Sequence, residues 1–409
     1  MNIILGVTGS ISAYKAYDIL RGLVKTNHQV KVILTKGAEN FILADTFLYL
    51  GAESVYTEND DFNPIANNGN VLHIVLKDWM DLLILAPASA NTLAKFYAGN
   101  CDDLLSSVFL SNQKKQCLIF PAMNTEMYLN PTTQRNLDYL ASLEHIFIHP
   151  PASGELACGE VGIGKLPCVD TIVETSLSFP LKKKLSPKSI LITTGATTAP
   201  LDPVRFMTNP SSGKTGFELS KEYLKQGDQV TLIYGSSSIK EIMLLKDHPN
   251  IKLVKIHTTQ DMYEQVLRHF EACDTYISCA AISDIKFIPN SEKLKKSNSK
   301  NELIFEWDTD ILKEVIKKKT HQKIISFAAE TDQLSKHFKN KWNNKPVDLM
   351  VGNQVNSGIN QKQLGFGQDE NHYYFVVNGS IIEEHDFTKN QLAHYLYHFS
   401  NQDMAIKNA

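Results

Sequence analysis

Hydrophobic and polar positions alternate along residues 1–150 in a way that predicts strands and helices in turn. Short runs of apolar, often β-branched residues predict five strands, with helical patterns between most of them. These runs are Ile3–Val7, Val30–Leu34, Leu82–Ala86, Cys117–Phe120 and His145–Ile148. Strands that are apolar along their whole length are typical of parallel sheets, because helices cover both faces of such sheets. This part of the chain is predicted to form a doubly wound α/β domain.

The alternation breaks at residues 178–189, SFPLKKKLSPKS, a basic run flanked by prolines that is typical of a linker. It then restarts, and an Asn-Gly pair between two β-rich runs in residues 372–385 predicts a hairpin. Strands are expected at Ile190–Thr194, Val230–Tyr234, Leu253–His257, Thr275–Ala280, Ile324–Ala328 and Leu349–Gly352, with helices at 213–225 and 259–270. We therefore expect two doubly wound α/β domains. Residues 1–180 form a flavodoxin-like or Rossmann-like domain and residues 188–409 a second, Rossmann-like one.

Composition narrows the class of protein. With 409 residues, 43% hydrophobic and 21% charged, the chain has enough apolar surface for two globular cores. The net charge of −3 argues against a general polyanion binder, so no nucleic-acid partner is expected. The first residues lack the pattern of a signal peptide or membrane span. The six cysteines form no CxxC pair, and we expect reduced thiols in a cytoplasmic protein with no membrane partner.

Small polar residues follow three of the predicted strands. They are Ser10 in TGSISAYK, Thr35 in LTKGA, and Ser89, Asn91 and Thr92 in APASANT. In an open parallel sheet, ligands bind beyond the carboxyl ends of the strands, where helix N-termini favour phosphate. A single hydroxyl there is often only a helix cap, but three such strand ends indicate a ligand with phosphate and ribityl or ribose groups.

Three other residues are candidates for chemistry. His73 has apolar neighbours in VLHIVL, where a lone histidine is more often structural than catalytic, and Asn124 follows a predicted strand end in PAMNTEM. Cys158 lies in residues 149–166, HPPASGELACGEVGIGKL, a glycine-rich run that resembles neither a helix nor a strand. That run fits a phosphate cradle, a surface loop or a mobile lid.

The motifs PASANT, KFYAGNCDDLL, PAMNTEM and LACGEVGIGK occur in this order along the first half. Together they resemble the flavoprotein family of cysteine decarboxylases, and residues 1–180 are similar to its phosphopantothenoylcysteine decarboxylase domains. The resemblance implies FMN, bound by Gly9, Ser10, Thr35, Ser89, Asn91 and Thr92. It also implies that His73 is the acid/base, that Asn124 anchors the substrate carboxylate and that Cys158 donates a proton.

The implied cofactor fits the implied reaction. Loss of CO₂ from an amino-acid-derived carboxylate leaves a carbanion without an electron sink, and a cofactor has to create one. In the family, oxidation of the thiol by FMN supplies the sink, and the flavin later returns the electrons. The four glycines of residues 149–166 then favour a lid that closes over the substrate and brings Cys158 with it.

The second half resembles phosphopantothenate–cysteine ligase domains. The resemblance rests on residues 193–220, with AAISDIKF, EKLKK, SFAAET and VDLMVGN further along. GKT at residues 213–215 does not belong to a P-loop, because Thr208 stands where the first glycine is required. The ligase activates a carboxylate with CTP, usually with Mg²⁺, to form an acyl-cytidylate that cysteine attacks.

The ligase resemblance implies a set of nucleotide-binding residues. Asn209 matches the residue that handles the acyl-cytidylate, and Arg205 is expected to order a neighbouring flap. The expected CTP contacts are Asp284, Lys293, Asp308, Thr309, Asp310, Ile311, Phe327, Lys341 and Lys345. The metal ligands stay unknown.

The leading hypothesis is an enzyme that ligates 4′-phosphopantothenate to cysteine and decarboxylates the product, in the synthesis of coenzyme A. One alternative is a non-catalytic FMN-binding regulatory subunit. Another, a nicotinamide oxidoreductase, lacks the GxGxxG motif and its acidic ribose partner. The resemblance also implies a homo-oligomer, a dodecamer built from trimers of the flavin domain and dimers of the ligase domain.

Overall fold

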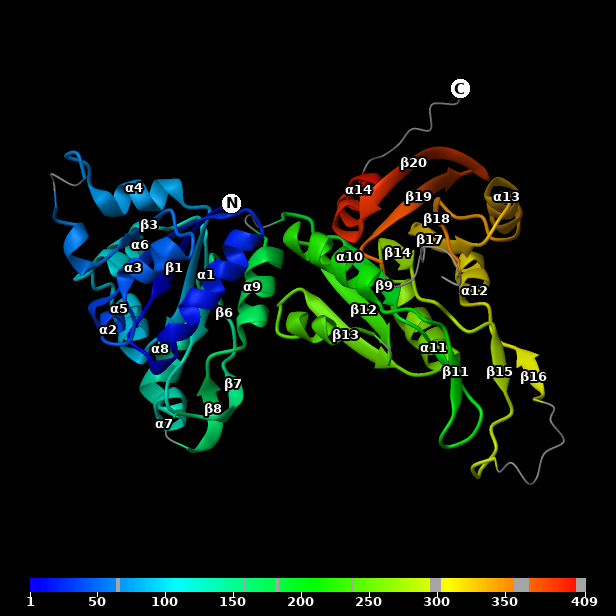
Figure 1. Cartoon of the computed structure of the whole chain (residues 1–409), viewed down its shortest axis with the longest axis horizontal. Helices are drawn as coiled ribbons and strands as arrows, with labels where there is room; N and C mark the ends of the chain where they lie inside the picture. Colours follow the sequence, from blue (N-terminus) through cyan, green and yellow to red (C-terminus); the bar gives the residue numbers. More distant parts are fainter. Residues whose placement is uncertain are drawn as a thin grey trace. The chain divides into compact units, whose positions relative to one another are not determined.

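The computed structural model divides the chain into two compact units, Met1–Lys183 and Lys184–Ala409 (Figure 1). It describes residues 1–63, 67–157, 159–180, 184–236, 238–294, 303–356 and 368–401. Each unit is built on one large sheet with helices on both faces. The predicted fold class, two doubly wound α/β domains, is confirmed.

The first unit contains a parallel six-stranded sheet in the order β3-β2-β1-β4-β5-β6. Its strands are β1 (Asn2–Val7), β2 (Gln29–Leu34), β3 (Ser54–Tyr56), β4 (Leu82–Ala88), β5 (Gln116–Pro121) and β6 (Ile146–Ile148). All five predicted strands are present, within two residues at each end. Only the short edge strand β3 was not predicted. This order is the Rossmann arrangement, in which the chain reverses direction across the sheet between β1 and β4.

Alternate residues of the first sheet face two hydrophobic cores. Ile3 and Leu5 pack on one side, and Ile4 packs on the other. The first core includes α1 (Ala16–Lys25), α3 (Ala44–Tyr49) and α9 (Val169–Ser178), and the second includes α4 (Leu72–Trp79), α5 (Ala90–Ala98), α6 (Leu104–Ser111) and α8 (Pro131–Ala141). Shorter turns of helix are η1 (Ile11–Lys15), α2 (Lys36–Glu39), η2 (Glu58–Asp60) and α7 (Thr125–Leu129).

The second unit repeats this strand order and extends it. Its eight-stranded sheet runs β13-β12-β9-β14-β17-β18-β19-β20, with β19 and β20 antiparallel at one edge. The strands are β9 (Ser189–Thr194), β12 (Gln229–Gly235), β13 (Ile251–Ile256), β14 (Thr275–Ser278), β17 (Lys323–Glu330), β18 (Leu349–Gln354), β19 (Glu370–Val377) and β20 (Ser380–Thr388). The predicted hairpin is confirmed, and Asn378 and Gly379 at its tip both have positive φ, as a two-residue turn of this kind requires.

Among the described residues of the second unit, five longer helices cover the sheet. One face packs against α10 (Lys214–Lys225) and α14 (Lys389–Asn401), together with the short η3 (Lys240–Leu245). The other face packs against α11 (Thr259–Phe270), α12 (Ile311–Lys317) and α13 (Leu334–Asn344). Two small hairpins were not predicted: β10 (Thr198–Pro200) with β11 (Phe206–Thr208), and β15 (Ile285–Phe287) with β16 (Phe305–Trp307). Both leave apolar side chains exposed.

The expectation that residues 149–166 contain neither helix nor strand is wrong. Within them β7 (Ala152–Glu155) pairs with β8 (Val161–Lys165) in an antiparallel hairpin beside α7 (Figure 1). Glycine has low strand propensity, which hid the hairpin from the pattern. Gly164 is required here, because its φ is 134° and a Cβ would lie 2.3 Å from the carbonyl oxygen of Met123. In the part of the chain that the structure describes, no helix is long and apolar enough to cross a membrane.

Candidate active sites

The carboxyl ends of β1 and β4 are tied together in the first unit. The hydroxyl of Thr8, which is fully buried, donates to the carbonyl oxygen of Pro87 at 2.8 Å and accepts from the backbone N–H of Ser89 at 2.8 Å. Ligands of this fold bind where the strand order reverses, and Thr8 fixes the geometry of that point. Thr8 immediately follows β1 and was not among the binding residues predicted from the sequence.

A cavity of about 670 Å³ opens at this edge of the first sheet. Its walls come from the turns after β1, β4 and β5 and from the β7–β8 hairpin. Of the residues expected to bind FMN, Gly9, Ser10, Ser89 and Asn91 line it. Thr35 and Thr92 are not among the lining residues. The Thr35 hydroxyl lies 3.4 Å from the carbonyl oxygen of Val7, and the Thr92 hydroxyl lies 3.2 Å from the side-chain hydroxyl of Ser89.

The polar groups of this cavity suit an anion. Ser10 caps η1 and Ser89 caps α5, so both helical segments begin at the cavity wall. Lys15 and Lys165 also line it, and neither was proposed from the sequence as a binding residue. Burial lowers the pKa of Lys15, and the positive charge of Lys165 lowers it further. A phosphate between them would relieve that repulsion.

Asn124 lies at the cavity wall directly beyond β5. It caps α7, and its side-chain oxygen accepts from the N–H of Glu126 at 2.8 Å. Its amide nitrogen donates to the carboxylate of Glu160, 3.3 Å away on the turn of the β7–β8 hairpin. The backbone N–H of Met123 donates to the carbonyl oxygen of Gly164 at 3.0 Å. The hairpin is therefore bonded to the strand end that presents Asn124.

Cys158, the expected proton donor, lies outside the described residues. Its chain neighbour Ala157 lines the cavity, as do Glu155 and Leu156.

His73 lies in α4 and is paired with a carboxylate that the sequence analysis missed. Its Nδ1 is 3.1 Å from Oδ1 of Asp61, whose side chain is only 4% exposed. The backbone N–H of His73 donates to the same oxygen at 3.3 Å. A buried carboxylate on Nδ1 fixes the orientation of the ring and leaves Nε2 for other contacts. His73 is not among the residues that line the cavity of its own chain.

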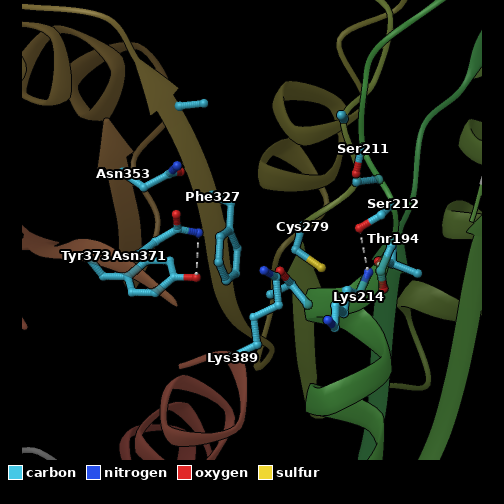
Figure 2. A pocket seen from close by; sticks show the side chains of 15 residues that line it. Thr194, Ser211, Ser212, Lys214, Cys279, Phe327, Asn353, Asn371, Tyr373 and Lys389 are labelled. Atoms are coloured by element: carbon cyan, nitrogen blue, oxygen red, sulfur yellow. Dashed lines mark hydrogen bonds between the residues drawn. The ribbon is translucent and has the colours of Figure 1, made fainter. Parts of the chain in front are cut away.

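The second unit has its own cavity, of about 190 Å³, at the equivalent edge of its sheet (Figure 2). Its walls come from the carboxyl ends of β9, β14, β17 and β18, the start of β19 and the N-termini of α10 and α14. Phe327, one of the expected CTP contacts, lines it. Other polar residues that line it were not predicted from the sequence as binding residues; they include Thr194, Ser212, Lys214, Asn353, Asn371, Tyr373 and Lys389.

The N-terminus of α10 closely approaches the end of β9. Gly213, with φ of 76°, precedes the helix, and the hydroxyl of Thr194 donates to its carbonyl oxygen at 3.0 Å. A Cβ at Gly216 would lie 2.3 Å from the Cβ of Thr194, so only glycine permits this contact. Gly213 and Gly216 therefore bring a helix N-terminus to the edge of the cavity, although the segment is not a P-loop.

The remaining expected CTP residues lie outside this cavity. The N–H of Asp308 donates to the carbonyl oxygen of Asp284 at 2.8 Å, and this bond closes the base of the β15–β16 hairpin. The N–H of Thr309 donates to the Asp308 carboxylate at 2.7 Å. Lys345 forms an ion pair with Asp310 at 2.5 Å, and Lys341 forms one with Glu330 at 2.6 Å. Asp310 also caps α12, which begins at Ile311. Lys293 is exposed.

Asn209 and Arg205 occupy the segment around β11. The Asn209 amide donates to the carbonyl oxygens of Ala281 and Ile282 at 3.2 and 3.1 Å, beside the cavity wall formed by Ala281. Arg205 bonds to the buried carboxylate of Asp202 and to the carbonyl oxygen of Leu294. The Arg205 guanidinium holds the pKa of Asp202 far below its usual range. Arg205 thus connects β10–β11 to the segment that carries Lys293.

Known proteins match both units. Residues 1–179 match the Flavoprotein family, and residues 185–402 match the DNA/pantothenate metabolism flavoprotein C-terminal domain family. The chain is 36% identical over 376 residues to the coenzyme A biosynthesis bifunctional protein CoaBC of Bacillus subtilis (strain 168), covering 90% of this chain and 89% of that protein. It is 36% identical over 375 residues to CoaBC of Escherichia coli (strain K12), with the same coverage.

A solved structure, the FMN binding protein AtHal3, is 32% identical to this chain, with a TM-score of 0.38. The match covers 43% of this chain and 94% of AtHal3.

Among the described residues, no group of three or more His, Cys, Asp or Glu side chains is placed to hold a metal ion. The matches to CoaBC extend over both units, and each unit has a cavity at the ligand-binding edge of its sheet. The chain belongs to the family of bifunctional coenzyme A biosynthesis proteins.

Proposed function

We propose that the two reactions of this bifunctional family, synthesis and decarboxylation of phosphopantothenoylcysteine, take place in two separate cavities of the chain. The first unit decarboxylates and the second ligates. The observation that carries the proposal is that each sheet, with the same order of its parallel strands, has a cavity of its own beyond its carboxyl edge. Each cavity has polar groups suited to a phosphorylated ligand.

The residues around the larger cavity fit FMN. Its volume of about 670 Å³ lies within the range of small-molecule sites. Ser10 and Lys15 would hold the phosphate at the turn after β1, and Ser89 and Asn91 would contact the polar chain of the cofactor. Bound FMN supplies the electron sink that decarboxylation needs. Thr35 and Thr92 would act from behind the wall by positioning the strand end and Ser89.

The side chains of the first unit would handle the carboxylate and the protons. We assign Asn124 to the substrate carboxylate, because Glu126 and Glu160 hold its amide in one orientation at the cavity wall. His73 would serve as the acid/base, oriented by Asp61. Cys158, which comes between β7 and β8 in the sequence, would deliver the proton that replaces CO₂. The expected lid is then an anchored hairpin whose turn closes over the substrate.

A second copy of the chain would complete this site. His73 does not line the cavity of its own chain, and its neighbours Val71, Ile74 and Val75 expose 55%, 39% and 43% of their surface. The cavity rim also exposes apolar side chains, from Ile11, Tyr14 and Phe41. Docking α4 of one copy beside the rim of another would bury both apolar surfaces and bring His73 to the substrate. The trimers, dimers and dodecamer implied by the resemblance stay a proposal.

Complementation tests this shared site. His73→Asn and Asn124→Ala should each lower CO₂ release by about 100-fold or more when expressed alone. Co-expressed, the two inactive chains should form some sites with an intact His73 and an intact Asn124, and activity should return in part. Absence of any recovery in a mixed oligomer would place both residues in one chain.

In the second unit, CTP would activate the carboxylate of 4′-phosphopantothenate. The carboxylate attacks the α-phosphorus, pyrophosphate leaves, and the cysteine amine then displaces CMP to form the amide. We assign Asn209 to the acyl-cytidylate, and Phe327, Asp284, Lys293, Lys341, Lys345 and residues 308–311 to CTP, with Mg²⁺ on the triphosphate. Ion pairs now hold Lys341 and Lys345, so these lysines would have to exchange partners when the nucleotide binds.

Separate assays test the two assignments. Purified protein given phosphopantothenoylcysteine without CTP should release CO₂ and show a flavin spectrum. Given 4′-phosphopantothenate, cysteine, CTP and Mg²⁺, it should release pyrophosphate. A flavin spectrum without either reaction would instead favour the non-catalytic FMN-binding subunit. The predicted cytoplasmic location stays a prediction from the sequence.

A further inference from the structure

Lys389 is a lysine buried in the second unit. It is the first residue of α14 and only 6% exposed, yet among the described residues its amino group has no hydrogen-bond partner. Burying an ammonium group without a partner is costly, so the folded protein carries an unfavourable charge at this point. Nothing in the ligase assignment above uses this residue.

The Lys389 side chain lies in the cavity of the second unit. Figure 2 shows it extending between Phe327 and Cys279, on the side of the cavity opposite the N-terminus of α10. Lys214, in the first turn of α10, lines the same cavity. Burial lowers the pKa of Lys389, and the positive charge of Lys214 lowers it further. Two cations and a helix N-terminus therefore converge on one small space.

The nearby carboxylates are already engaged. Asp369 forms an ion pair with Lys214, and its side chain is 78% exposed. Glu218 forms an ion pair with Lys221, 3.5 Å away on the next turn of α10. Both carboxylates act on Lys389 only at a distance, where they partly offset the lowering of its pKa. The space between Lys389 and α10 is thus electropositive, and an anion bound there would supply the missing partner.

The cavity volume limits what can enter. At about 190 Å³ it is smaller than a typical site for a whole nucleotide, so it accommodates one end of a ligand whose remainder extends outward. The lining is mostly polar around α10, where the hydroxyl of Ser212 accepts from the N–H of Lys214 at 3.4 Å. A phosphate group at that end of the ligand would suit two ammonium groups and a helix N-terminus, because all three favour a negative charge.

We infer that Lys389 binds a phosphate group of a ligase substrate, between its own ammonium group, Lys214 and the N-terminus of α10. The inference rests on the proposed ligase function. Two substrates could supply the phosphate: the triphosphate of CTP or the terminal phosphate of 4′-phosphopantothenate. In either case, Lys389 is a substrate-binding residue, and the binding free energy offsets the cost of burying its charge in the free protein.

Equilibrium binding to the full-length protein separates the two sources and needs no turnover. CTP, 4′-phosphopantothenate and inorganic pyrophosphate are each titrated into the wild type and Lys389→Met, which keeps most of the unbranched side chain but removes its charge. Truncating one member of a buried charge pair weakens binding by about 30-fold or more. We expect this loss for the ligand whose phosphate Lys389 binds, and a change within about threefold for the other. The affinity for pyrophosphate should fall together with the affinity for CTP only if Lys389 binds the triphosphate.

Two further variants keep the test decisive. Lys225→Met, at the exposed far end of α10, removes the same charge outside the cavity and should leave all affinities unchanged. Lys214→Met should lower the affinity for the same ligand as Lys389→Met does. Because binding is measured directly, a failed ligase assay with selective loss of CTP affinity would reject the proposed reaction but keep the phosphate site. Unchanged affinity for both substrates, or equal weakening of all ligands with a lower melting temperature, would overturn the inference.

Discussion

The two cavities occupy the same place on sheets with the same order of parallel strands, but they differ in how their cations are held. In the first unit, Lys15 and Lys165 stand at the edge of a wide cavity that a hairpin borders. In the second, Lys389 is buried in a small cavity between two helix N-termini. The strand order fixes where a ligand binds, and the segments beyond the strands determine its chemistry.

The largest difference in effect on the two activities is expected from His73→Asn. Removing a positioned acid/base costs about 10²- to 10⁴-fold in rate. CO₂ release from phosphopantothenoylcysteine should fall by about that factor, while pyrophosphate release from CTP stays at the wild-type level. A parallel loss of both activities would mean that the cavities do not work independently.

Asp61→Asn should also slow decarboxylation, but by a smaller factor than His73→Asn. The carboxylate makes a charge-assisted hydrogen bond to His73, and such bonds contribute about 1.5 to 3 kcal/mol. Decarboxylation should slow by about 10- to 100-fold, with little change in the KM of the substrate. Combining it with His73→Asn should add nothing further, since Asp61 acts through the imidazole. An additive loss would give Asp61 a role of its own.

Gly164→Ala should disturb the hairpin and leave the second unit intact. The new Cβ would lie 2.3 Å from the Met123 carbonyl oxygen at a positive φ, and strain of this kind costs about 1 to 3 kcal/mol. Thermal unfolding followed by flavin release should shift to lower temperature, and CO₂ release should fall. Gly99→Ala is the matched control, because Gly99 also has positive φ but no atom within 4 Å of the new Cβ.

The smallest predicted effect is the pH dependence of Lys389. Its pKa is lowered in the folded protein, so between that value and the ordinary one, near 10.4, the unfolded chain binds more protons. Stability of the ligand-free wild type should therefore rise with pH across this window. Lys389→Met should be more stable than the wild type at neutral pH, and the difference should shrink as the pH rises. Unfolding curves measured at several pH values test the sign.

The parallel strands of both sheets other than β3 could be predicted, because buried parallel strands are continuous apolar runs. The β7–β8 hairpin could not, since Gly154, Gly162 and Gly164 replace the β-branched residues that identify strands, and the reason for glycine lies in contacts with residues far away in sequence. The β10–β11 and β15–β16 hairpins are only three residues per strand and carry no alternation long enough to detect.

The site residues divide in a similar way. Ser10, Ser89, Asn91 and Asn124 stand directly after predicted strands, so topology alone brings them to one edge. Asp61 and Lys389 could not be found in this way. Asp61 meets His73 from a separate loop, and Lys389 begins the last helix, far in sequence from Lys214. The motif-matched lysines, Lys341 and Lys345, lie in ion pairs outside the cavity of the free chain.

One coupled reaction tests the central claim, that the two cavities act in sequence, most directly. Wild-type protein receives 4′-phosphopantothenate, cysteine, CTP and Mg²⁺, and pyrophosphate and CO₂ are followed together. We predict that they reach equal amounts, with CO₂ appearing after pyrophosphate and neither appearing when CTP is omitted. CO₂ released without CTP, or pyrophosphate that is never followed by CO₂, would contradict the account.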